Sequence, residues 1–440
     1  MLARLAGICL ATAFCCAAAD EVLRLSLHQA VEIALKPEGS TRVQLSGESV
    51  KQAEARSAQA RSALLPDLES SITDQNQTRN LKALGFQFPM VPGFTIPSFV
   101  GPFDTFDVRA TMTQSLFDFS SIRRYQAAKS GIQSARSDSD GTRNQVTGDV
   151  ARAYLGALRA NAALETAQAN VELSEALLKL ARSQKEIGTS TGIEITRAQV
   201  QLSNDRQRML VAENDRDRTL LQLLKVLGLR LETNVELTDK LKYEAVDTVP
   251  VEQYVAQARE KRPELKAQEQ REATAQLNHS AVKYERLPSL AGFADYGTIG
   301  SSINNALPTR TYGVSLRVPV FDGGKRDARR AESASAWRSE KIRTADLRDQ
   351  VDLEVRLALD ALRSSDAQVQ TAEEGLKLAE NELAQARRRY EAGVTNNIEV
   401  TDAQTRLDRA RENRIAALYN YNLARIDLGT ATGSIRSMLP

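Results

Sequence analysis

The chain has 440 residues, of which 42% are hydrophobic and 26% are charged, a composition typical of folded rather than disordered proteins. Its 58 lysines and arginines nearly balance its 56 aspartates and glutamates, so the formal charge is +2 and no basic surplus indicates a nucleic-acid partner. All three cysteines lie within the first 16 residues, which excludes disulfides, thiol catalysis and cysteine-ligated metals from the rest of the chain.

The first residues have the order of a secretory signal peptide. Arg4 precedes the apolar run 5–13, and three alanines then provide a cleavage site. We therefore expect residues 1–19 to be removed and the protein to be exported. Lipidation of Cys15 or Cys16 is not expected, because neither follows a small residue. Further along, no apolar run approaches the ~18 residues of a transmembrane helix, so any membrane insertion must use strands.

Two long proline-free tracts mark an internal duplication. They predict long helices over about 120–187 and 324–391. The segment GTSTGIEITRAQ at 188–199 is repeated as GVTNNIEVTDAQ at 393–404, an offset of 205 residues. At ~1.5 Å per residue each long helix would measure about 100 Å, too long for an ordinary globular domain.

Both long helices carry a heptad pattern in which large and small residues alternate, as in a coiled-coil seam. Shorter helices are expected at about 41–64 and 193–228 beside the first long helix, and at about 263–286 and 398–429 beside the second. The large heptad residues of the second helix are Val355, Leu362, Val369, Leu376, Leu383 and Tyr390, and the small ones are Ala358, Ser365, Ala372, Ala379 and Ala386.

Segments of period two lie between the helices. Alternation over 108–116 and 311–320 predicts the second strand of two hairpins, with partners at about 67–78 and 289–300. Strands of about 10 residues match the ~9 to 11 that cross a bilayer at a tilt. Four strands cannot close a barrel, so a membrane sheet would require oligomerisation. The alternative is a soluble sheet with one buried face.

The first hairpin carries an insertion of about 18 residues that falls within 81–106. This segment contains six of the eleven phenylalanines and four prolines, too many prolines for a strand. We expect an extracellular loop whose aromatic side chains plug the barrel mouth, pack on rim lipids or bind something outside.

Together these features resemble the TolC family of outer-membrane efflux proteins over residues 22–433. The resemblance rests on the duplicated order of helix, hairpin and helix, on Arg262-Pro263-Glu264-Leu265, on Leu-Pro before each hairpin, on VPVFDGG at 318–324 and on the twin turns. It implies a mainly α fold with a membrane β-barrel, in which three copies share twelve strands and continue as an α-helical periplasmic tunnel. Ser115 departs from the pattern, because the second repeat has Pro319 there.

The implied organisation is a first repeat over 20–240 with a hairpin at about 67–117, a second over 241–433 with a hairpin at about 289–321, and a tail at 434–440. The implied location is the outer membrane of a Gram-negative bacterium, in contact with its lipid and with a large periplasmic part. We expect no enzyme activity, no cofactor and no nucleic acid.

The implied function is a passive exit duct of a tripartite efflux system. A homotrimer would couple through a periplasmic adaptor protein to an inner-membrane transporter and expel small molecules. Two alternatives stay open: the same duct serving type I protein secretion, and a soluble periplasmic coiled-coil scaffold or adaptor. The sequence identifies neither the substrate nor the pump.

The resemblance also implies a gate at the second-repeat turn. Glu399 and Asp402 occupy the positions of two inward carboxylates in the family. Residues i and i+3 share a helix face, so three copies would place six carboxylates around one axis. Such a ring favours cations and could bind a divalent metal that blocks the channel. Without the resemblance, the two acids near a helix start are explained by the helix dipole.

Further gate positions follow from the same resemblance. Tyr390 matches a gate-linking tyrosine, although it is also a heptad core position, and Glu194 matches its acidic partner. Thr395 stands where the family has a basic residue, so Arg197 is our candidate for the cation that holds the closed state.

The two turns match the tips where the family docks its adaptor. We expect docking at Gly188 and Thr189 in the first repeat and at Gly393 and Val394 in the second. The structural explanation of both glycines is a helix C-cap, where glycine accepts positive φ. The two interpretations are compatible.

Overall fold

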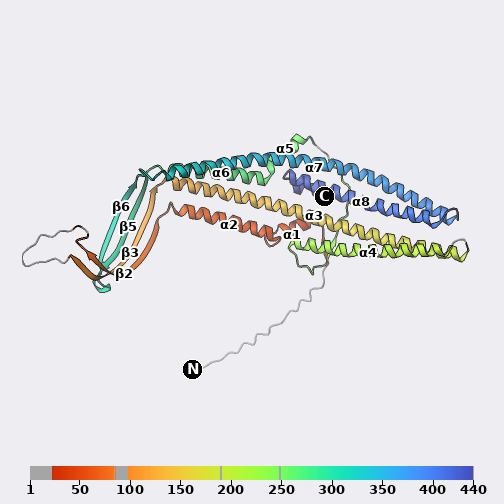
Figure 1. The fold of residues 1–440 in the computed structure, drawn as a ribbon, viewed down its shortest axis with the longest axis horizontal. Coiled ribbons are helices and arrows are strands. Elements are labelled where there is room, and N and C mark those ends of the chain that lie inside the picture. Colours follow the sequence, from red (N-terminus) through yellow and green to blue (C-terminus); the bar gives the residue numbers. More distant parts are fainter. Residues whose placement is uncertain (1–21, 84, 86–97, 189–190, 247–248, 440) are drawn as a thin grey trace, which may run out of the picture. The chain divides into compact units, whose positions relative to one another are not determined.

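The computed structural model describes residues 22–83, 85, 98–188, 191–246 and 249–439. The predicted signal peptide and residues 86–97 of the phenylalanine-rich segment lie outside them. The helices (Figure 1) are α1 Leu27–Leu35, α2 Thr41–Ser62, α3 Phe119–Glu186, α4 Gly192–Leu227, α5 Val251–Lys261, α6 Pro263–Tyr284, α7 Lys325–Glu391, α8 Asn397–Ala431 and α9 Ile435–Met438.

The two long helices agree with their predicted bounds to within one residue. They are α3 and α7, of 68 and 67 residues. The heptad pattern explains why these helices form. Residues at the predicted coiled-coil seam are largely buried: Val355, Val369 and Tyr390 are 0%, 0% and 4% exposed. The short helices α1, α5 and α9 were not predicted, since none carries a long repeating pattern.

The described chain divides into two compact units, and neither coincides with a repeat. The first comprises residues up to 44, 142–261 and 352–440, and the second comprises 45–141 and 262–351. Each unit therefore contains segments of both repeats. The predicted repeat boundaries describe the duplication, not these units.

The first unit has its main apolar core where α1 packs with α3, α4 and α8. In it, strand β1, Leu23–Leu25, pairs in parallel with β4, Val235–Leu237. Ser26 starts α1 with a capping box, which satisfies backbone N–H groups at the helix start. Asp239 ties these parts together, because its carboxylate accepts hydrogen bonds of 2.8 Å from the backbone N–H of Leu27 and from the hydroxyl of Tyr154.

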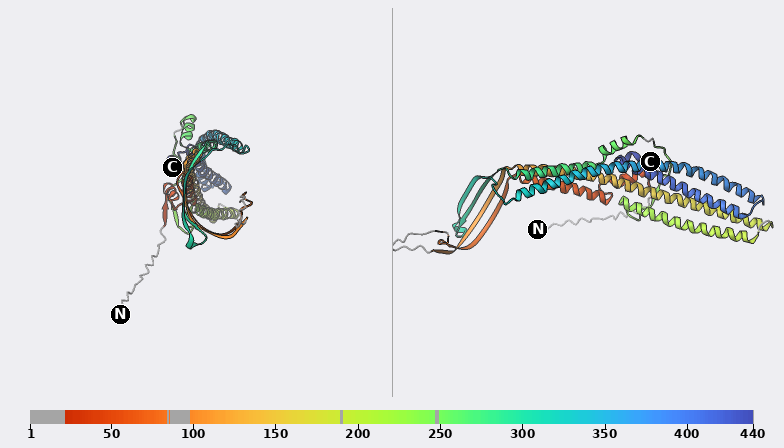
Figure 2. Two further views of the ribbon diagram at one scale, coloured as in Figure 1. Left: turned by 90° about the vertical axis from the view of Figure 1, so that its left-hand side faces the viewer. Right: turned by 45° about the horizontal axis from the view of Figure 1, so that its top comes forward.

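The second unit contains an antiparallel four-stranded sheet, curved as Figure 2 shows. Its strands are β2 Asp67–Asn80, β3 Phe99–Phe117, β5 Ser289–Gly300 and β6 Leu307–Arg317, in the order β2-β3-β5-β6. The two hairpins of the duplication are thus neighbours. Strands β2 and β6 form the edges of the sheet.

The sheet has one largely apolar and one polar face. Directly paired residues lie on the same face, and the register aligns Leu68 with Met112 and Ala294 with Tyr312. Exposed apolar side chains of this face are Leu68, Ile72, Met112, Tyr296, Tyr312, Val314 and Leu316. On the other face Arg109 forms ion pairs with Asp107 and Asp295, with N–O distances of 3.2 and 2.5 Å.

Two strand predictions need correction. Alternation predicted a strand to residue 320, but β6 ends at Arg317, because Pro319 has no N–H for the ladder. Ser115 keeps its N–H, and β3 accordingly continues to Phe117. Conversely, β3 begins at Phe99, within the segment expected to be a loop. Pro102 is tolerated because the register with β2 shifts between Gln77 and Arg79, a bulge that removes the need for a regular ladder bond there.

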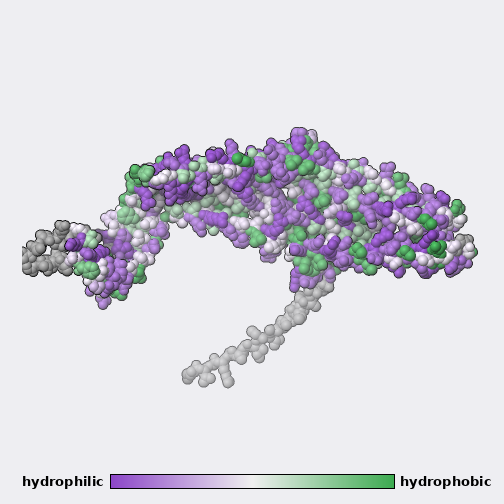
Figure 3. All heavy atoms as spheres, in the orientation of Figure 1, coloured by the Kyte–Doolittle hydropathy of each residue, from purple (hydrophilic) through white to green (hydrophobic). Residues whose placement is uncertain are grey.

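The helices carry many charged side chains along their length. Within the described ranges, none is both long and apolar enough to cross a membrane. The face of the helices shown in Figure 3 is accordingly mostly hydrophilic.

Candidate functional site: two helical turns and a buried polar cluster

The two turns between long and shorter helices have similar backbones. Gly188 follows α3 with φ +83° and Gly393 follows α7 with φ +70°, a region that favours glycine. Val394 is 70% exposed, and its N–H donates to the carbonyl of Arg389 over 3.0 Å. Thr189, the remaining predicted docking residue, lies outside the described residues.

The first-repeat turn contacts the start of α8 through Glu194. Its carboxylate accepts a 3.1 Å hydrogen bond from the backbone N–H of Asn397, which belongs to the first turn of α8. Arg197, one helix turn further along α4, pairs with the same carboxylate at 3.6 Å. Arg197 and Glu194, the predicted cation and acid of the gate, are therefore neighbours, and Glu194 contacts the second repeat.

Glu399 has an ion-pair partner that we did not predict. It pairs with Arg389 at the end of α7 over 3.3 Å and accepts a short hydrogen bond from the hydroxyl of Thr395. Thr395 thus contacts Glu399 as a neutral donor. Arg389 was missed, although it lies just before the predicted Tyr390 in the sequence.

Asp402 is exposed and lines a groove of about 290 Å³ between α4 and α8, together with Arg197, Val200 and Ile398. The groove brings one predicted carboxylate and the predicted cation to the same place. Tyr390 is instead buried, in a core that includes Leu383 and Val400. Its carbonyl accepts a 3.1 Å hydrogen bond from the side-chain amide of Gln184 on α3.

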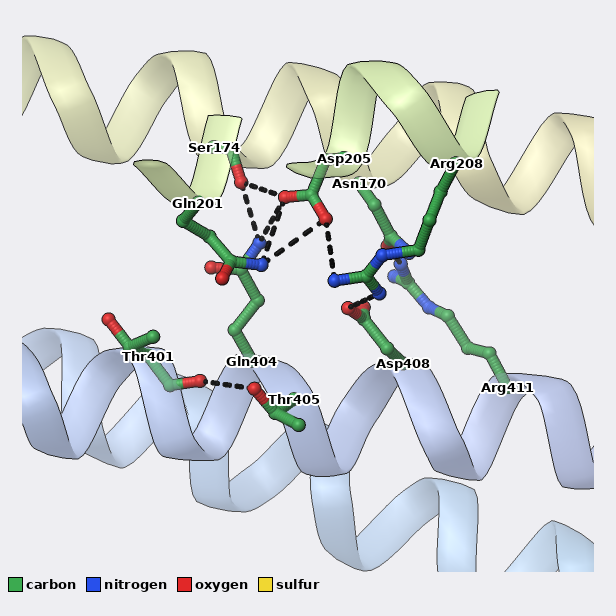
Figure 4. A network of polar contacts seen from close by, with 10 residues as sticks. All are labelled: Asn170, Ser174, Gln201, Asp205, Arg208, Thr401, Gln404, Thr405, Asp408 and Arg411. Carbon is green, nitrogen blue, oxygen red and sulfur yellow. Dashed lines mark hydrogen bonds and ion pairs between the residues drawn. The ribbon is translucent and has the colours of Figure 1, made fainter. Parts of the chain in front are cut away.

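A polar cluster that we did not predict lies further from the turns, between α3, α4 and α8 (Figure 4). Asp205 on α4 accepts hydrogen bonds from Ser174 on α3 and from Gln404 on α8, and the Gln404 amide also donates to Ser174 over 2.8 Å. All three side chains are at most 2% exposed. Buried polar groups that satisfy one another fix how the helices align.

Arg208 joins a second carboxylate to this cluster. It pairs with Asp205 at 3.2 Å and with Asp408 of α8 at 3.5 Å. Burial raises the pKa of Asp408 to about 6, and the nearby charge of Asp205 adds to that increase. A signal was available in the sequence: Ala198, Leu202 and Asp205 follow a four-and-three spacing, which places the acid on the buried stripe of α4.

Comparison with known proteins relates this arrangement to a family. The sequence profile of the family described as Outer membrane efflux protein matches residues 43–229 and 254–434. The Pyoverdine export outer membrane protein OpmQ of Pseudomonas putida is 25% identical over 415 residues, 92% of this chain and 85% of that protein. The Alkaline protease secretion protein AprF of Pseudomonas aeruginosa is 24% identical over 335 residues, 72% of this chain and 68% of that protein.

A solved structure shares the fold. The Campylobacter jejuni CmeC outer membrane channel superimposes with a TM-score of 0.79 at 16% identity, over 93% of this chain and 86% of that one. The profile covers both repeats, including both turns and the polar cluster. The chain therefore belongs to the family of outer membrane efflux proteins and is located in the outer membrane.

Proposed function

We propose that this protein is a passive trimeric exit duct, in which three copies share one twelve-stranded barrel. The observation that carries the proposal is the four-stranded sheet, with its exposed apolar face and with β2 and β6 at its edges. In lipid an unpaired strand edge is very costly, and pairing β2 of one copy with β6 of the next would remove it. Membership of an outer membrane family favours this interpretation over a soluble sheet.

The gate of the duct would lie at the second-repeat turn. Glu399 and Asp402 are one helix turn apart, and Asp402 is exposed beside the α4–α8 groove. In a trimer these side chains would form a ring of six carboxylates that favours cations and binds divalent metals. The hydrogen bond from Asn397 to Glu194 and the pair of Arg389 with Glu399 would hold the closed state.

The turns themselves would receive the adaptor. A Cβ built on Gly188 or Gly393 would meet nothing within 4 Å, and Val394 is 70% exposed, so these positions are accessible to a partner. We place Thr189 in the same docking site on sequence grounds alone. A periplasmic adaptor bound there would connect the duct to an inner-membrane transporter that supplies the energy.

The proposed cargo is a small molecule. OpmQ of P. putida is named for pyoverdine export and matches 92% of this chain. The second candidate is type I protein secretion, favoured by the match to AprF, which is named for alkaline protease secretion. Deleting the gene and measuring both retained dye and secreted protein separates the two, because only the function that the duct serves is lost.

The test of the duct is planar-bilayer conductance of the detergent-extracted protein. We expect discrete, cation-selective openings that divalent cations block, with block weakened in Glu399→Ala/Asp402→Ala. Glu391→Ala, which removes another acid near the same turn, is the matched control and should keep the block. Absence of conductance from a trimer that inserts into the bilayer would contradict the duct.

A further inference from the structure

The apolar face of the sheet is long enough to cross a bilayer. On β3 it runs from Leu116, close to the start of α3, to Phe106. The ten residue steps between them extend about 34 Å along the strand, at ~3.4 Å per residue. At the tilt of about 40° usual in membrane barrels this gives a depth of about 26 Å, which matches the ~25 Å apolar band of such barrels.

This face carries two charged side chains among the paired residues of the described strands. Between the pair Asp74–Phe106 at one end and the pair Leu290–Leu316 at the other, they are Asp74 on β2 and Arg310 on β6. Asp74 lies in the last row of the band. Strands β3 and β5 separate the two charges within one chain, so Arg310 does not reach Asp74.

Arg310 lies near the end of the sheet that points away from the helices. Strand β6 begins at Leu307, after the turn that joins it to β5, and Arg310 is three residues further along. That separation is about 10 Å along a strand. At their other ends β5 follows α6 and β6 leads to α7. In the proposed duct, with its helices in the periplasm, the β5–β6 turn would therefore face the outside of the cell.

Two tyrosines flank Arg310 on the same face. Tyr296 pairs with it directly across β5 and β6, and Tyr312 is two residues further along β6. They are 66% and 80% exposed. A tyrosine has an apolar ring and a polar hydroxyl, so it is favoured where lipid tails meet head groups. In the proposed duct, the two rings would place Arg310 at the head-group level of the outer leaflet.

Arg310 has no counter-charge within the part of the chain that the structure describes. Its side chain is exposed and forms no ion pair or hydrogen bond with a described residue. Arg109, on the polar face of β3, is by contrast paired with Asp107 and Asp295. A charge on a lipid-facing surface is costly unless a partner neutralises it. The partner of Arg310 must then be an anionic group outside its own chain.

We propose that Arg310, with Tyr296 and Tyr312, binds a phosphate group of lipid A, the phosphorylated glycolipid of the outer leaflet. This inference rests on the proposed function, because it requires the apolar face to lie in the bilayer. A guanidinium can donate two parallel charge-assisted hydrogen bonds to a phosphate, and the tyrosine hydroxyls are additional donors. Phospholipid head groups of the other leaflet would lie beyond Leu316, about 20 Å further along the strand.

Lipid retention by the purified protein tests this site. The detergent-extracted protein is incubated with bisphosphorylated lipid A and its mass is measured by native mass spectrometry. We expect the wild type to retain lipid A and Arg310→Gln to retain severalfold less, because the variant cannot neutralise the phosphate. Arg310→Lys keeps the charge but cannot form the two parallel hydrogen bonds, so it should retain an intermediate amount.

Arg317→Gln is the matched control. It removes an exposed arginine from the same strand, on the polar face and at the opposite end of β6. This variant should retain as much lipid A as the wild type. Equal losses in Arg310→Gln and Arg317→Gln would show that net charge alone attracts the lipid and would overturn the assignment.

Two further probes identify the ligand. Dephosphorylated lipid A should be retained severalfold less than the bisphosphorylated form, because the phosphate is the group that Arg310 binds. Phosphatidylglycerol, an anionic phospholipid, should not displace bound lipid A at equal concentration. Retention without phosphates, or displacement by phosphatidylglycerol at equal concentration, would contradict a lipid A site.

Conductance of the same preparations distinguishes this inference from the proposed function. If the wild type conducts and Arg310→Gln retains lipid A as the wild type does, the duct stands and the lipid site is wrong. If the wild type is a single chain that neither conducts nor retains lipid A, both proposals are wrong.

Discussion

Asp205 on α4 and Asp408 on α8 share one guanidinium, that of Arg208, at N–O distances of 3.2 and 3.5 Å. The two carboxylate side chains are 1% and 5% exposed. Two buried acids thus share one cation, whose own side chain is 50% exposed. Of the other charges that act on Asp408, Arg411 favours its ionised form and Glu412 opposes it. The contact between the repeats is therefore held by a cluster whose charge depends on pH.

The first prediction concerns this pH dependence. The pKa of Asp408 rises from 3.8 to about 6 on folding, chiefly by burial. The native state then binds more protons than the unfolded state between these values, so the free energy of unfolding falls as pH rises through this window. The cost of ionisation above it is about 3 kcal/mol, from ~1.4 kcal/mol per pKa unit.

Asp408→Asn measures this cost, because asparagine keeps the shape and removes the titration. The wild type should gain stability between pH 7.5 and pH 5, measured as the unfolding temperature of the purified protein. We expect the variant to gain less over the same range. Asp360→Asn, at an exposed position of α7, is the control and should follow the wild type. Equal pH dependence in wild type and Asp408→Asn would contradict the assignment.

The second prediction concerns Ser174, the donor to the buried Asp205. Ser174→Ala leaves a buried carboxylate with one donor fewer, which costs about 1–3 kcal/mol. Ser203, on the exposed side of α4, is the matched control, and Ser203→Ala should change stability by less than about 0.5 kcal/mol. Thermal unfolding of the two variants at one pH decides, and equal losses would show that the cluster does not stabilise the contact.

The long helices and the repeat could be predicted because heptad patterns and prolines determine structure within their own segment of the sequence. The ends of strands β3 and β6 could not be predicted, because where a strand begins or ends depends on its pairing with a neighbouring strand. The bulge opposite Gln77 allows β3 to start before Pro102, and nothing in the sequence of β3 reveals that partner. Helix α1 was missed because its apolar residues face a core assembled from distant segments.

The candidate site was predictable for related reasons. The repeat located both turns, and the family resemblance located their acids. Which cation meets which acid was not predictable, because it depends on how two helix ends approach in space. Arg197 was our candidate for the cation that holds the closed state, and the structure adds Arg389 as the ion-pair partner of Glu399.

The third prediction separates these two cations. Arg389→Ala removes the pair with Glu399, and Glu194→Gln weakens the acceptor for the N–H of Asn397. Both should raise the open probability of single channels, Glu194→Gln more strongly because its side chain is only 13% exposed. Arg388→Ala, an exposed neighbour, should leave it unchanged. Arg197→Ala tests the other cation. If that variant leaves the conductance unchanged, Arg197 does not help to hold the closed state.

The last prediction concerns the glycine of the second turn. Gly393 has φ +70°, where alanine costs about 1 kcal/mol or more. A Cβ there meets nothing within 4 Å, so the cost comes from the backbone alone. Gly156 lies inside α3 of the same unit, also with nothing within 4 Å, so Gly156→Ala should stabilise by about 0.5–1 kcal/mol.

The unfolding temperatures should therefore shift in opposite directions, downward for Gly393→Ala and upward for Gly156→Ala. If the turn also docks the adaptor, Gly393→Ala should reduce co-purification of the adaptor, whereas Gly156→Ala should not. A Gly393→Ala protein as stable as the wild type would show that the turn adopts another backbone. If Gly393→Ala loses stability as expected but still binds the adaptor fully, Gly393 acts as the helix cap and does not take part in docking. The two roles can be told apart because stability and adaptor binding are measured separately.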